Sequence, residues 1–364
     1  MSTFITGRLT RRSFVNSIGA ALGGTGALLA GGLPISIANS AATKTPFGVA
    51  VELEPFRNDP EYRKALIKYA DILVPMNALK WASLRHNRHE FDFAGADEII
   101  EFAKLHGKSV RGHALLWYAY NPKWVEAISG AKQAEKLLVE HIEQVVDRYR
   151  GVIPSWDVVN EVVAHDPLSQ GNWRKGIWLD LLGRKHVEIA FKAAAKTDPN
   201  AQLVINDYDL ANFGQRFDAR RNAILAIVRN LQDQNIPVHG VGLQAHLYAE
   251  RETDADGLAL FVKKLTSLGV KLLVTELDVI DWRLARDHPK RDLAVARTAA
   301  EFLTALYSAG KVESITCWGI TDKYSWISDV FKRKDGAPNR PLPLDQNYQP
   351  KPLFHTIEKY RNLG

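Results

Sequence analysis

Short apolar runs alternate with longer amphipathic segments through most of the chain. In the long segments, such as residues 95–107 and 134–150, apolar residues recur every three or four positions, which is typical of helices with one buried face. The short runs are typical of buried strands. They predict strands over Phe47–Leu53, Asp71–Pro75, Ser109–Leu116, Ser155–Val159, Gln202–Ile205, Gly240–Gln244, Lys271–Thr275 and Ser314–Trp318.

The alternation of strands and helices favours a parallel sheet, because each parallel connection needs a crossover that a helix usually provides. Eight such units in roughly 320 residues predict an α/β fold of the (β/α)8 TIM barrel type. We expect this barrel to be a single domain over residues 43–364, since no linker or change of composition divides that part of the chain.

Residues 1–42 differ from the rest of the chain. Thr10–Asn16 (TRRSFVN) contains paired arginines followed by Phe, and Ile18–Ala38 is apolar but rich in Gly and Ala. Together with small residues near position 40, this predicts a cleaved twin-arginine signal peptide that engages the twin-arginine export machinery. The mature protein would then be periplasmic or secreted.

A transmembrane anchor is the alternative for the same segment. It is disfavoured because the glycines make the segment only weakly hydrophobic and no basic stop-transfer cluster follows it. No other apolar run is long enough to span a membrane, so we expect no membrane contact in the mature form.

The charge balance is only mildly basic. The net charge is +6, and removing Arg8, Arg11 and Arg12 with the signal peptide leaves 44 basic and 41 acidic residues, or +3. This excess is too small to predict nucleic-acid binding. The single cysteine, Cys317, excludes an intrachain disulfide and a cysteine-based metal cluster.

Polar and aromatic residues gather where the predicted strands end. In a barrel of this type the carboxyl ends of the strands meet at one face, and active sites lie there. The residues at these ends are Asn77, Lys80, His113, Trp117, Asn160, Glu161, Tyr208, Gln244, His246, Glu276, Trp318 and Trp326. One such residue would be an ordinary cap, but their repetition from strand to strand predicts a shared site.

Two glutamates stand out among these residues. Glu161 follows the fourth predicted strand, and Glu276 lies inside the apolar run KLLVTELDVID, where an unpaired carboxylate would be costly to bury. In a circle of eight strands the two face each other across the mouth. Two carboxylates that flank a sugar are the minimal equipment of a glycosidase, one as acid/base and one as nucleophile.

Neighbouring residues offer support for these carboxylates. We expect His246 to hold Glu276, and Asp278 to orient His246, because side chains two residues apart on a strand share a face. We also expect Asn160, directly before Glu161, to hydrogen-bond a sugar hydroxyl. A solvated strand end is the alternative reading of Asp278.

Aromatic residues at the strand ends are a further signal of sugar binding. Pyranose rings have C–H faces that pack on flat aromatic surfaces. Trp81, Trp117, Tyr208, Trp318 and Trp326 fall at strand ends or in the loops after them, so we expect sugar platforms there, with core packing as the alternative.

Other chemistries lack their motifs. There is no His-x-His on the first strand, no His-Glu-x-x-His, no Gly-x-Ser-x-Gly, and no phosphate-binding Gly-x-Gly-x-x-Gly after a strand. The sequence therefore predicts chemistry without a metal or an organic cofactor.

Six motifs together carry a family resemblance. They are RGHALLW (111–117), WDVVNE (156–161), NDYD (206–209), GLQAH (242–246), VTELDV (274–279) and WGITDKYSW (318–326). With this set the chain, over residues 47–360, resembles the family 10 glycoside hydrolases, the retaining endo-β-1,4-xylanases. The resemblance implies a (β/α)8 barrel that cleaves internal β-1,4 linkages of xylan or a related polysaccharide by double displacement. We expect a monomer.

The resemblance also implies a role for individual residues. Glu161 would be the acid/base and Glu276 the nucleophile. The subsites near the cleavage point would be lined by Asn77, Lys80, His113, Trp117, Asn160, Gln244, His246, Trp318 and Trp326.

Two departures from the family pattern affect one subsite. Met76 stands where the family usually has Glu, and Tyr118 and Tyr120 stand where it tends to have His and Gln. The missing groups would contact the second sugar on the non-reducing side, and each lost hydrogen bond to a hydroxyl costs about 0.5–1.5 kcal/mol. We therefore expect an altered, more apolar subsite there.

Two alternatives to a xylanase follow from these patterns. The first is a hydrolase of a different bacterial or plant β-linked glycan, which the altered subsite would accommodate. The second is a non-catalytic sugar-binding barrel. It is disfavoured because such a protein would not need two glutamates together with a supporting histidine and aspartate.

Overall fold

The computed structural model describes residues 44–363. The predicted signal peptide, residues 1–42, lies outside this range. Within residues 44–363, no helix combines the length and the apolar character needed to cross a membrane.

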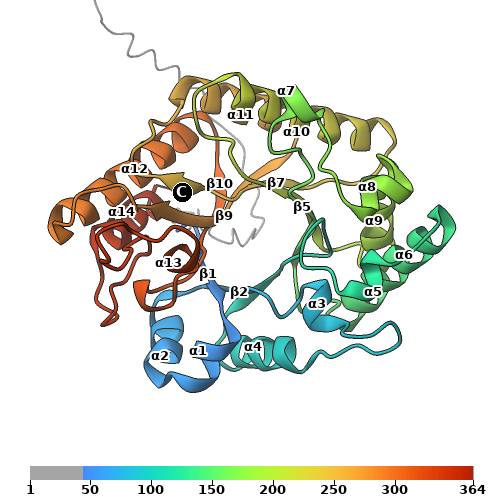
Figure 1. The fold of residues 1–364 in the computed structure, drawn as a ribbon, viewed down its shortest axis with the longest axis horizontal. Helices are drawn as coiled ribbons and strands as arrows, with labels where there is room; N and C mark the ends of the chain where they lie inside the picture. Colours follow the sequence, from blue (N-terminus) through green and yellow to red (C-terminus); the bar gives the residue numbers. More distant parts are fainter. Residues whose placement is uncertain (1–43, 364) are drawn as a thin grey trace, which may run out of the picture. The chain divides into compact units, whose positions relative to one another are not determined.

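Parallel strands form a closed barrel (Figure 1). They are β1 (Phe47–Val51), β2 (Ile72–Pro75), β3 (Ser109–Gly112), β5 (Ser155–Asn160), β6 (Gln202–Asp207), β7 (Gly240–Leu243), β9 (Lys271–Ile280) and β10 (Val312–Cys317). Each pairs in parallel with the next, and β10 pairs with both β9 and β1, which closes the ring. The predicted TIM barrel is confirmed.

Helices surround this barrel and also occupy the loops at one of its ends. They are α1 (Leu53–Asn58), α2 (Pro60–Tyr69), α3 (Trp81–Leu84), α4 (Ala94–Leu105), α5 (Lys123–Glu126), α6 (Ala131–Arg148), α7 (Pro167–Gln170), α8 (Ile177–Leu182), α9 (Lys185–Thr197), α10 (Gln215–Asp233), α11 (Ala255–Ser267), α12 (His288–Ala309), α13 (Ile327–Val330) and α14 (Pro352–Arg361). A 3-10 turn covers Asp322–Tyr324.

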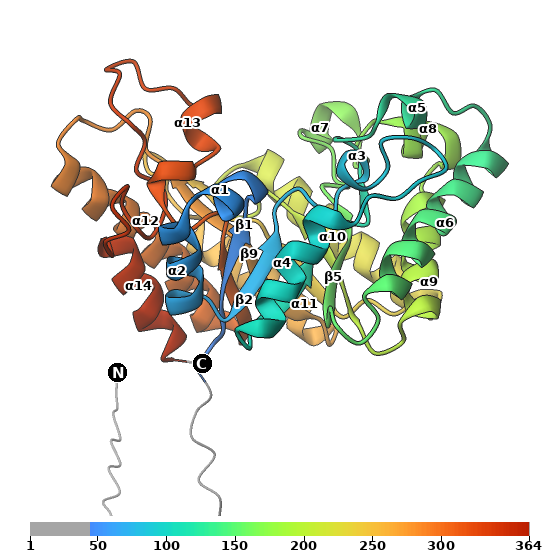
Figure 2. The same ribbon diagram turned by 90° about the horizontal axis from the view of Figure 1, so that it is seen from below.

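The loops at the carboxyl ends of the strands rise on two sides of the barrel. Figure 2 shows α13 and its neighbouring loops on one side, and α3, α5, α7 and α8 on the other. The two sides form rims around the strand ends, where the polar residues of the sequence lie.

Two short strands lengthen the sheet at this end. β4 (Leu116–Trp117) pairs with β5, and β8 (His246–Tyr248) pairs with β9. Because β8 supplies partners as far as Ile280, β9 continues beyond its predicted end at Thr275. Glu276 and Asp278 therefore lie inside a paired strand.

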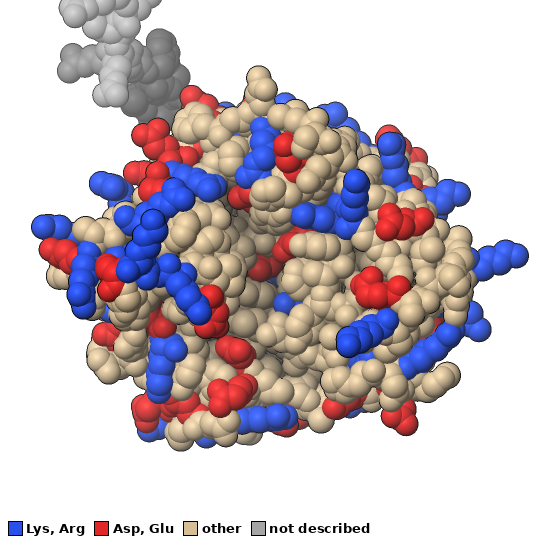
Figure 3. Space-filling view, in the orientation of Figure 1, with Lys and Arg blue, Asp and Glu red and all other residues tan. Residues whose placement is uncertain are grey.

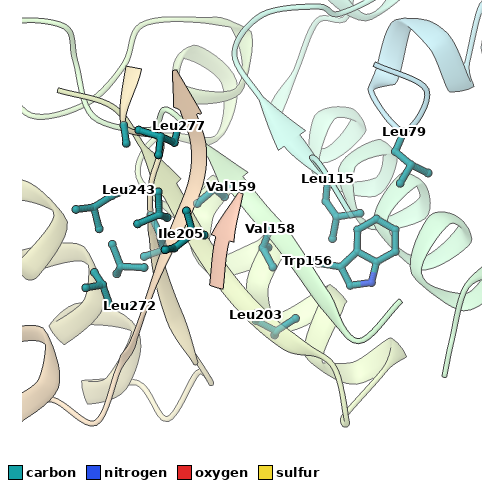
Figure 4. Close-up of a cluster of buried hydrophobic side chains, with 14 of the residues drawn as sticks. Leu79, Leu115, Trp156, Val158, Val159, Leu203, Ile205, Leu243, Leu272 and Leu277 are labelled. Carbon is teal, nitrogen blue, oxygen red and sulfur yellow. The ribbon is translucent and has the colours of Figure 1, made fainter. Parts of the chain in front are cut away.

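Close packing of apolar side chains holds the sheet and helices together. Figure 4 shows part of this core, with Leu203, Ile205 and Leu272 among the buried residues. Trp156 on β5 is fully buried against β3, and a Cβ atom at Gly112 would lie 2.1 Å from its ring. Glycine at this position is therefore a packing requirement.

Candidate active site

A cavity of about 440 Å³ opens at the carboxyl ends of the strands. Figure 3 shows the hollow from above, with acidic atoms at its base. The cavity brings together many of the residues singled out in the sequence: Met76, Asn77, Lys80, His113, Trp117, Tyr118, Asn160, Glu161, Tyr208, Gln244, His246, Glu276, Trp318 and Trp326.

Five further residues line the cavity that the strand-end pattern does not predict. His165, Asp209, Tyr248, Ile280 and Phe331 also line the cavity. Asp209 ends the NDYD motif and Ile280 lies in the apolar run of Glu276, whereas His165, Tyr248 and Phe331 lie outside the six motifs. Their place in the wall depends on how the two rims fold.

Glu276 is a buried carboxylate held from several directions. Its Oε1 accepts a hydrogen bond of 2.6 Å from Nδ2 of Asn206, and its Oε2 lies 3.2 Å from Nε2 of His246. Nδ1 of His113 lies 3.9 Å away. Burial by itself would raise the pKa of Glu276, but His246, His113 and Lys80 lower it below its ordinary value. The ionised form suits a nucleophile.

His246 is held in turn by Asp278, as the shared strand face predicted. Its Nδ1 lies 2.9 Å from Oδ1 of Asp278, and the two residues are paired in the register of β8 and β9. Although burial opposes the imidazolium, Asp278 and Glu276 raise the pKa of His246 to about 10. His246 is therefore a cation next to Glu276 at neutral pH.

Glu161 has a different environment from Glu276. It follows β5 with a φ of 55°, and its backbone N–H donates 2.8 Å to the carbonyl of Asn206. Left-handed backbone is costly for a residue other than glycine and is often found at functional sites. The side chain is partly exposed and accepts one hydrogen bond, 3.2 Å from Nε2 of Gln244.

A row of amides connects the two carboxylates. Oδ1 of Asn160 accepts from Nε2 of Gln244 at 3.1 Å and from Nδ2 of Asn206 at 2.9 Å. The same two amides also donate to Glu161 and Glu276. Asn206 was not singled out in the sequence, where its only signal was its place at the start of the NDYD motif.

His113 is positioned by a buried ion pair below the cavity. Asp157 on β5 pairs with the guanidinium of Arg111, and its Oδ2 lies 2.9 Å from Nδ1 of His113. All three residues are buried. This arrangement fixes the imidazole that faces Glu276.

One family model matches most of the chain. The model described as Glycosyl hydrolase family 10 matches residues 36–360. The chain belongs to glycosyl hydrolase family 10.

The chain is similar to curated proteins and to solved structures. Endo-1,4-beta-xylanase 3 of Hypocrea jecorina is 34% identical over 319 residues, which are 86% of this chain and 82% of the relative. Beta-1,4-xylanase of Dictyoglomus thermophilum is 34% identical over 310 residues, 82% of this chain and 84% of the relative. The crystal structure of native xylanase 10B from Thermotoga maritima is 28% identical, covers 88% of this chain and 95% of its own, and has a TM-score of 0.79.

Lys80 is the cation at one end of this family 10 cavity. Its ammonium donates to Oδ1 of Asn77 at 2.9 Å and lies 4.7 Å from the ring centre of Trp117 and 5.7 Å from that of Trp318. The pKa of Lys80 lies below its ordinary value, because burial lowers it by more than Glu276 and Glu161 raise it. No carboxylate of residues 44–363 lies within 4.0 Å of the ammonium.

The three residues that depart from the family pattern lie around this end. Met76 is buried and packs with Trp318, while Tyr118 lines the cavity. Tyr120 is 47% exposed and does not line the cavity, but Lys80 lies 5.6 Å from its ring centre.

Tyr208 and Tyr118 form the wall on the Glu161 side. The hydroxyl of Tyr208 accepts from Arg174 and lies 3.0 Å from Nδ1 of His165. The guanidinium of Arg174 also lies 4.7 Å from the ring centre of Tyr118. One arginine therefore supports both aromatic rings.

One predicted sugar platform is wrong. Trp81 is buried in the core, where it stacks on His141 at 3.7 Å and donates 2.8 Å to the carbonyl of Leu115. Its ring faces α6, because the loop after β2 turns into α3 at this residue.

Residues 44–363 contain no group of three or more His, Cys, Asp or Glu side chains placed to hold a metal ion.

Proposed function

We propose that the protein is a retaining endo-β-1,4-xylanase that cleaves internal linkages of xylan or a related β-linked polysaccharide. The observation that carries this proposal is the contrast between two carboxylates in one cavity. Glu276 is buried, hydrogen-bonded and next to a cationic histidine, whereas Glu161 is partly exposed with a single donor. Such a pair can divide the roles of nucleophile and acid/base.

The reaction follows from these roles. Glu276 attacks the anomeric carbon while Glu161 gives its proton to the leaving glycosidic oxygen, so that the bond to the leaving sugar breaks as a glycosyl ester forms. Glu161, now ionised, takes a proton from water, and the resulting hydroxide displaces Glu276. The two displacements retain the anomeric configuration.

Substitution of each glutamate tests this proposal. Glu276→Ala and Glu161→Ala should each lose most turnover on xylan and on an aryl β-xyloside, measured as released reducing ends and released phenol. Glu135→Gln, an exposed carboxylate on α6, is the control and should keep full activity. Near-normal turnover by either glutamate variant would contradict the assignment.

The same assay separates the enzyme from a non-catalytic sugar-binding barrel. A binding protein would retain xylo-oligosaccharides without cleaving them, and the two glutamate substitutions would then change affinity only. Turnover by the unsubstituted protein on a panel of β-linked glycans would exclude that function.

A narrower proposal concerns the substrate. Lys80 has no carboxylate partner within residues 44–363. Met76 lines the same cavity and packs with Trp318, whose ring centre lies 5.7 Å from the Lys80 ammonium. These contacts support a preference for a substituted xylan or another β-linked polymer in the second non-reducing-side subsite. Efficient cleavage of unbranched xylohexaose that is not improved by Met76→Glu would contradict this preference.

Export is a separate proposal about residues 1–42. The paired Arg11 and Arg12, with the apolar segment after them, support recognition by the twin-arginine export machinery and a periplasmic or secreted mature protein. Changing both arginines to lysine should trap the precursor in the cytoplasm, as seen by fractionation and immunoblotting. Unchanged export of this double variant would contradict the proposal.

A further inference from the structure

Asp278 is a fully buried carboxylate, and each of its oxygens is held by one side chain. Oδ1 lies 2.9 Å from Nδ1 of His246, and Oδ2 accepts a 2.8 Å hydrogen bond from the indole N–H of Trp326. His246 reaches Glu276 through its other nitrogen at 3.2 Å. A continuous row of contacts therefore runs from the indole to Glu276.

Trp326 also forms part of the cavity wall, directly before α13. Its ring packs edge-on against His246, with the ring centres 5.1 Å apart. Trp318 is the neighbouring tryptophan of this wall and packs edge-on against His113 at 5.0 Å. Between these two indoles, only that of Trp326 donates to Asp278.

We infer that Trp326 is a positioning residue for the nucleophile as well as a wall for the sugar. Its N–H fixes Asp278, Asp278 fixes His246, and the imidazolium orients Glu276 and keeps it ionised. The role at the nucleophile rests on the proposed function of Glu276, whereas the row of contacts does not. A residue of the cavity wall is thus hydrogen-bonded to the side chains that hold the reacting carboxylate.

Loss of the indole N–H would change the charge next to Glu276. Burial raises the pKa of Asp278, while His246 and the Trp326 hydrogen bond lower it. Without the indole donor the carboxylate is a stronger base, so it draws the shared proton away from Nδ1 of His246. Less positive charge then remains next to Glu276. The pKa of Glu276 rises as a result, because burial of this carboxylate is no longer offset by a full imidazolium charge. The enzyme would need a higher pH to ionise its nucleophile.

Other charged groups face the same row and stay in place when the indole is changed. Lys80 and His113 act on Glu276, and Glu161 lies across the cavity. Tyr248 and Cys317 lie close enough to Asp278 for its charge to raise the pKa of each. Because none of these contacts Nε1 of Trp326, a change confined to that atom isolates its contribution.

The sharpest test replaces Trp326 with β-(3-benzothienyl)alanine, in which sulfur takes the place of the N–H and the ring keeps its shape. Trp326→Phe is the second variant, and Trp318→Phe is the control that removes a wall indole without touching Asp278. For each variant, kcat/KM on a xylo-oligosaccharide is measured as a function of pH. The acid limb of this profile is its low-pH side, where activity falls as the nucleophile becomes protonated. Thermal unfolding shows that each variant is folded.

We expect the acid limb of both Trp326 variants to move up by about one pH unit, the effect of losing part of a hydrogen bond to a charged group. Trp318→Phe should raise KM and move the limb by less than either Trp326 variant, because Trp318 packs against His113 but does not donate to Asp278. A rise in KM at Trp326 with an unmoved limb would overturn the positioning role.

A substrate-free measurement separates this result from the proposed function. In proton–nitrogen NMR spectra of the unliganded protein, the benzothienyl variant should show the His246 Nδ1 proton drawn toward Asp278, with a lower pKa of the imidazole. Unchanged His246 signals would overturn the coupling, whatever the enzyme cleaves. Changed signals in a protein without xylanase activity would refute the proposed function alone.

Discussion

Replacing Asn206 with alanine should move the pH dependence of the reaction while both glutamates stay in the cavity. Asn206 is fully buried, and its amide donates 2.6 Å to Glu276 and 2.9 Å to Asn160. A hydrogen bond to a charged group contributes about 1.5–3 kcal/mol. Because one pKa unit corresponds to about 1.4 kcal/mol, the loss should raise the pKa of Glu276 by about one to two units.

The assay is the acid limb of kcat/KM on xylohexaose, measured for Asn206→Ala and for Thr275→Val. The hydroxyl of Thr275 donates 2.6 Å to Oδ1 of Asn206, so the control perturbs the same asparagine without removing a donor to Glu276. We expect the limb to rise in Asn206→Ala and to stay within a few tenths of a unit in Thr275→Val. A folded Asn206→Ala protein with an unmoved limb would refute the reasoning.

Three further predictions concern stability and substrate choice. The pKa of His246 is raised to about 10 in the folded protein, so its stabilising contribution is complete below the unfolded value of about 6.5 and is lost as pH rises toward 10. The difference in unfolding free energy between the unsubstituted protein and His246→Asn should shrink over that window, and a constant difference would contradict the assigned charge. Gly112→Ala should lower the unfolding free energy by about 1–3 kcal/mol in urea titrations, because its Cβ would lie 2.1 Å from the ring of Trp156; an unchanged midpoint would contradict the packing. Met76→Glu should improve kcat/KM on unbranched xylo-oligosaccharides by giving Lys80 a carboxylate partner, and an unimproved value would show that the methionine does not limit their binding.

The barrel could be predicted from the sequence because each strand and helix has a recognisable pattern of apolar residues within its own segment. Apolar runs and three-to-four-residue periodicity depend only on which side chains face the core. The extent of β9 depends on a different element, since β8 supplies the partners that carry it to Ile280. Local patterns contain no signal for such pairing, so the predicted end at Thr275 fell short.

The same limit applied to the site. Glu161, Glu276 and His246 could be predicted as site residues because an ionisable group next to an apolar run is costly to bury without a partner or a function. Asn206 cannot be found in this way because an uncharged amide near the end of a strand is ordinary, and its importance comes from partners on β5 and β9.

Trp81 was misplaced for a related reason. An indole that follows a strand suggests a sugar platform. This ring instead stacks on His141 of α6, a residue far from Trp81 in the sequence. Periodicity and motif spacing describe neighbours along the chain, and they leave open which distant helix packs over a loop. The difference between a platform and a core residue was therefore visible only in three dimensions.

Trapping a glycosyl ester on Glu276 tests most directly whether Glu276 is the nucleophile of a retaining glycosidase. The protein would be incubated with a fluorinated xylobioside that carries an activated leaving group, then digested and analysed by mass spectrometry. We predict one added disaccharide on the peptide that contains Glu276, and none in Glu276→Ala. An adduct on a different residue, or turnover with inversion and no adduct, would contradict the claim.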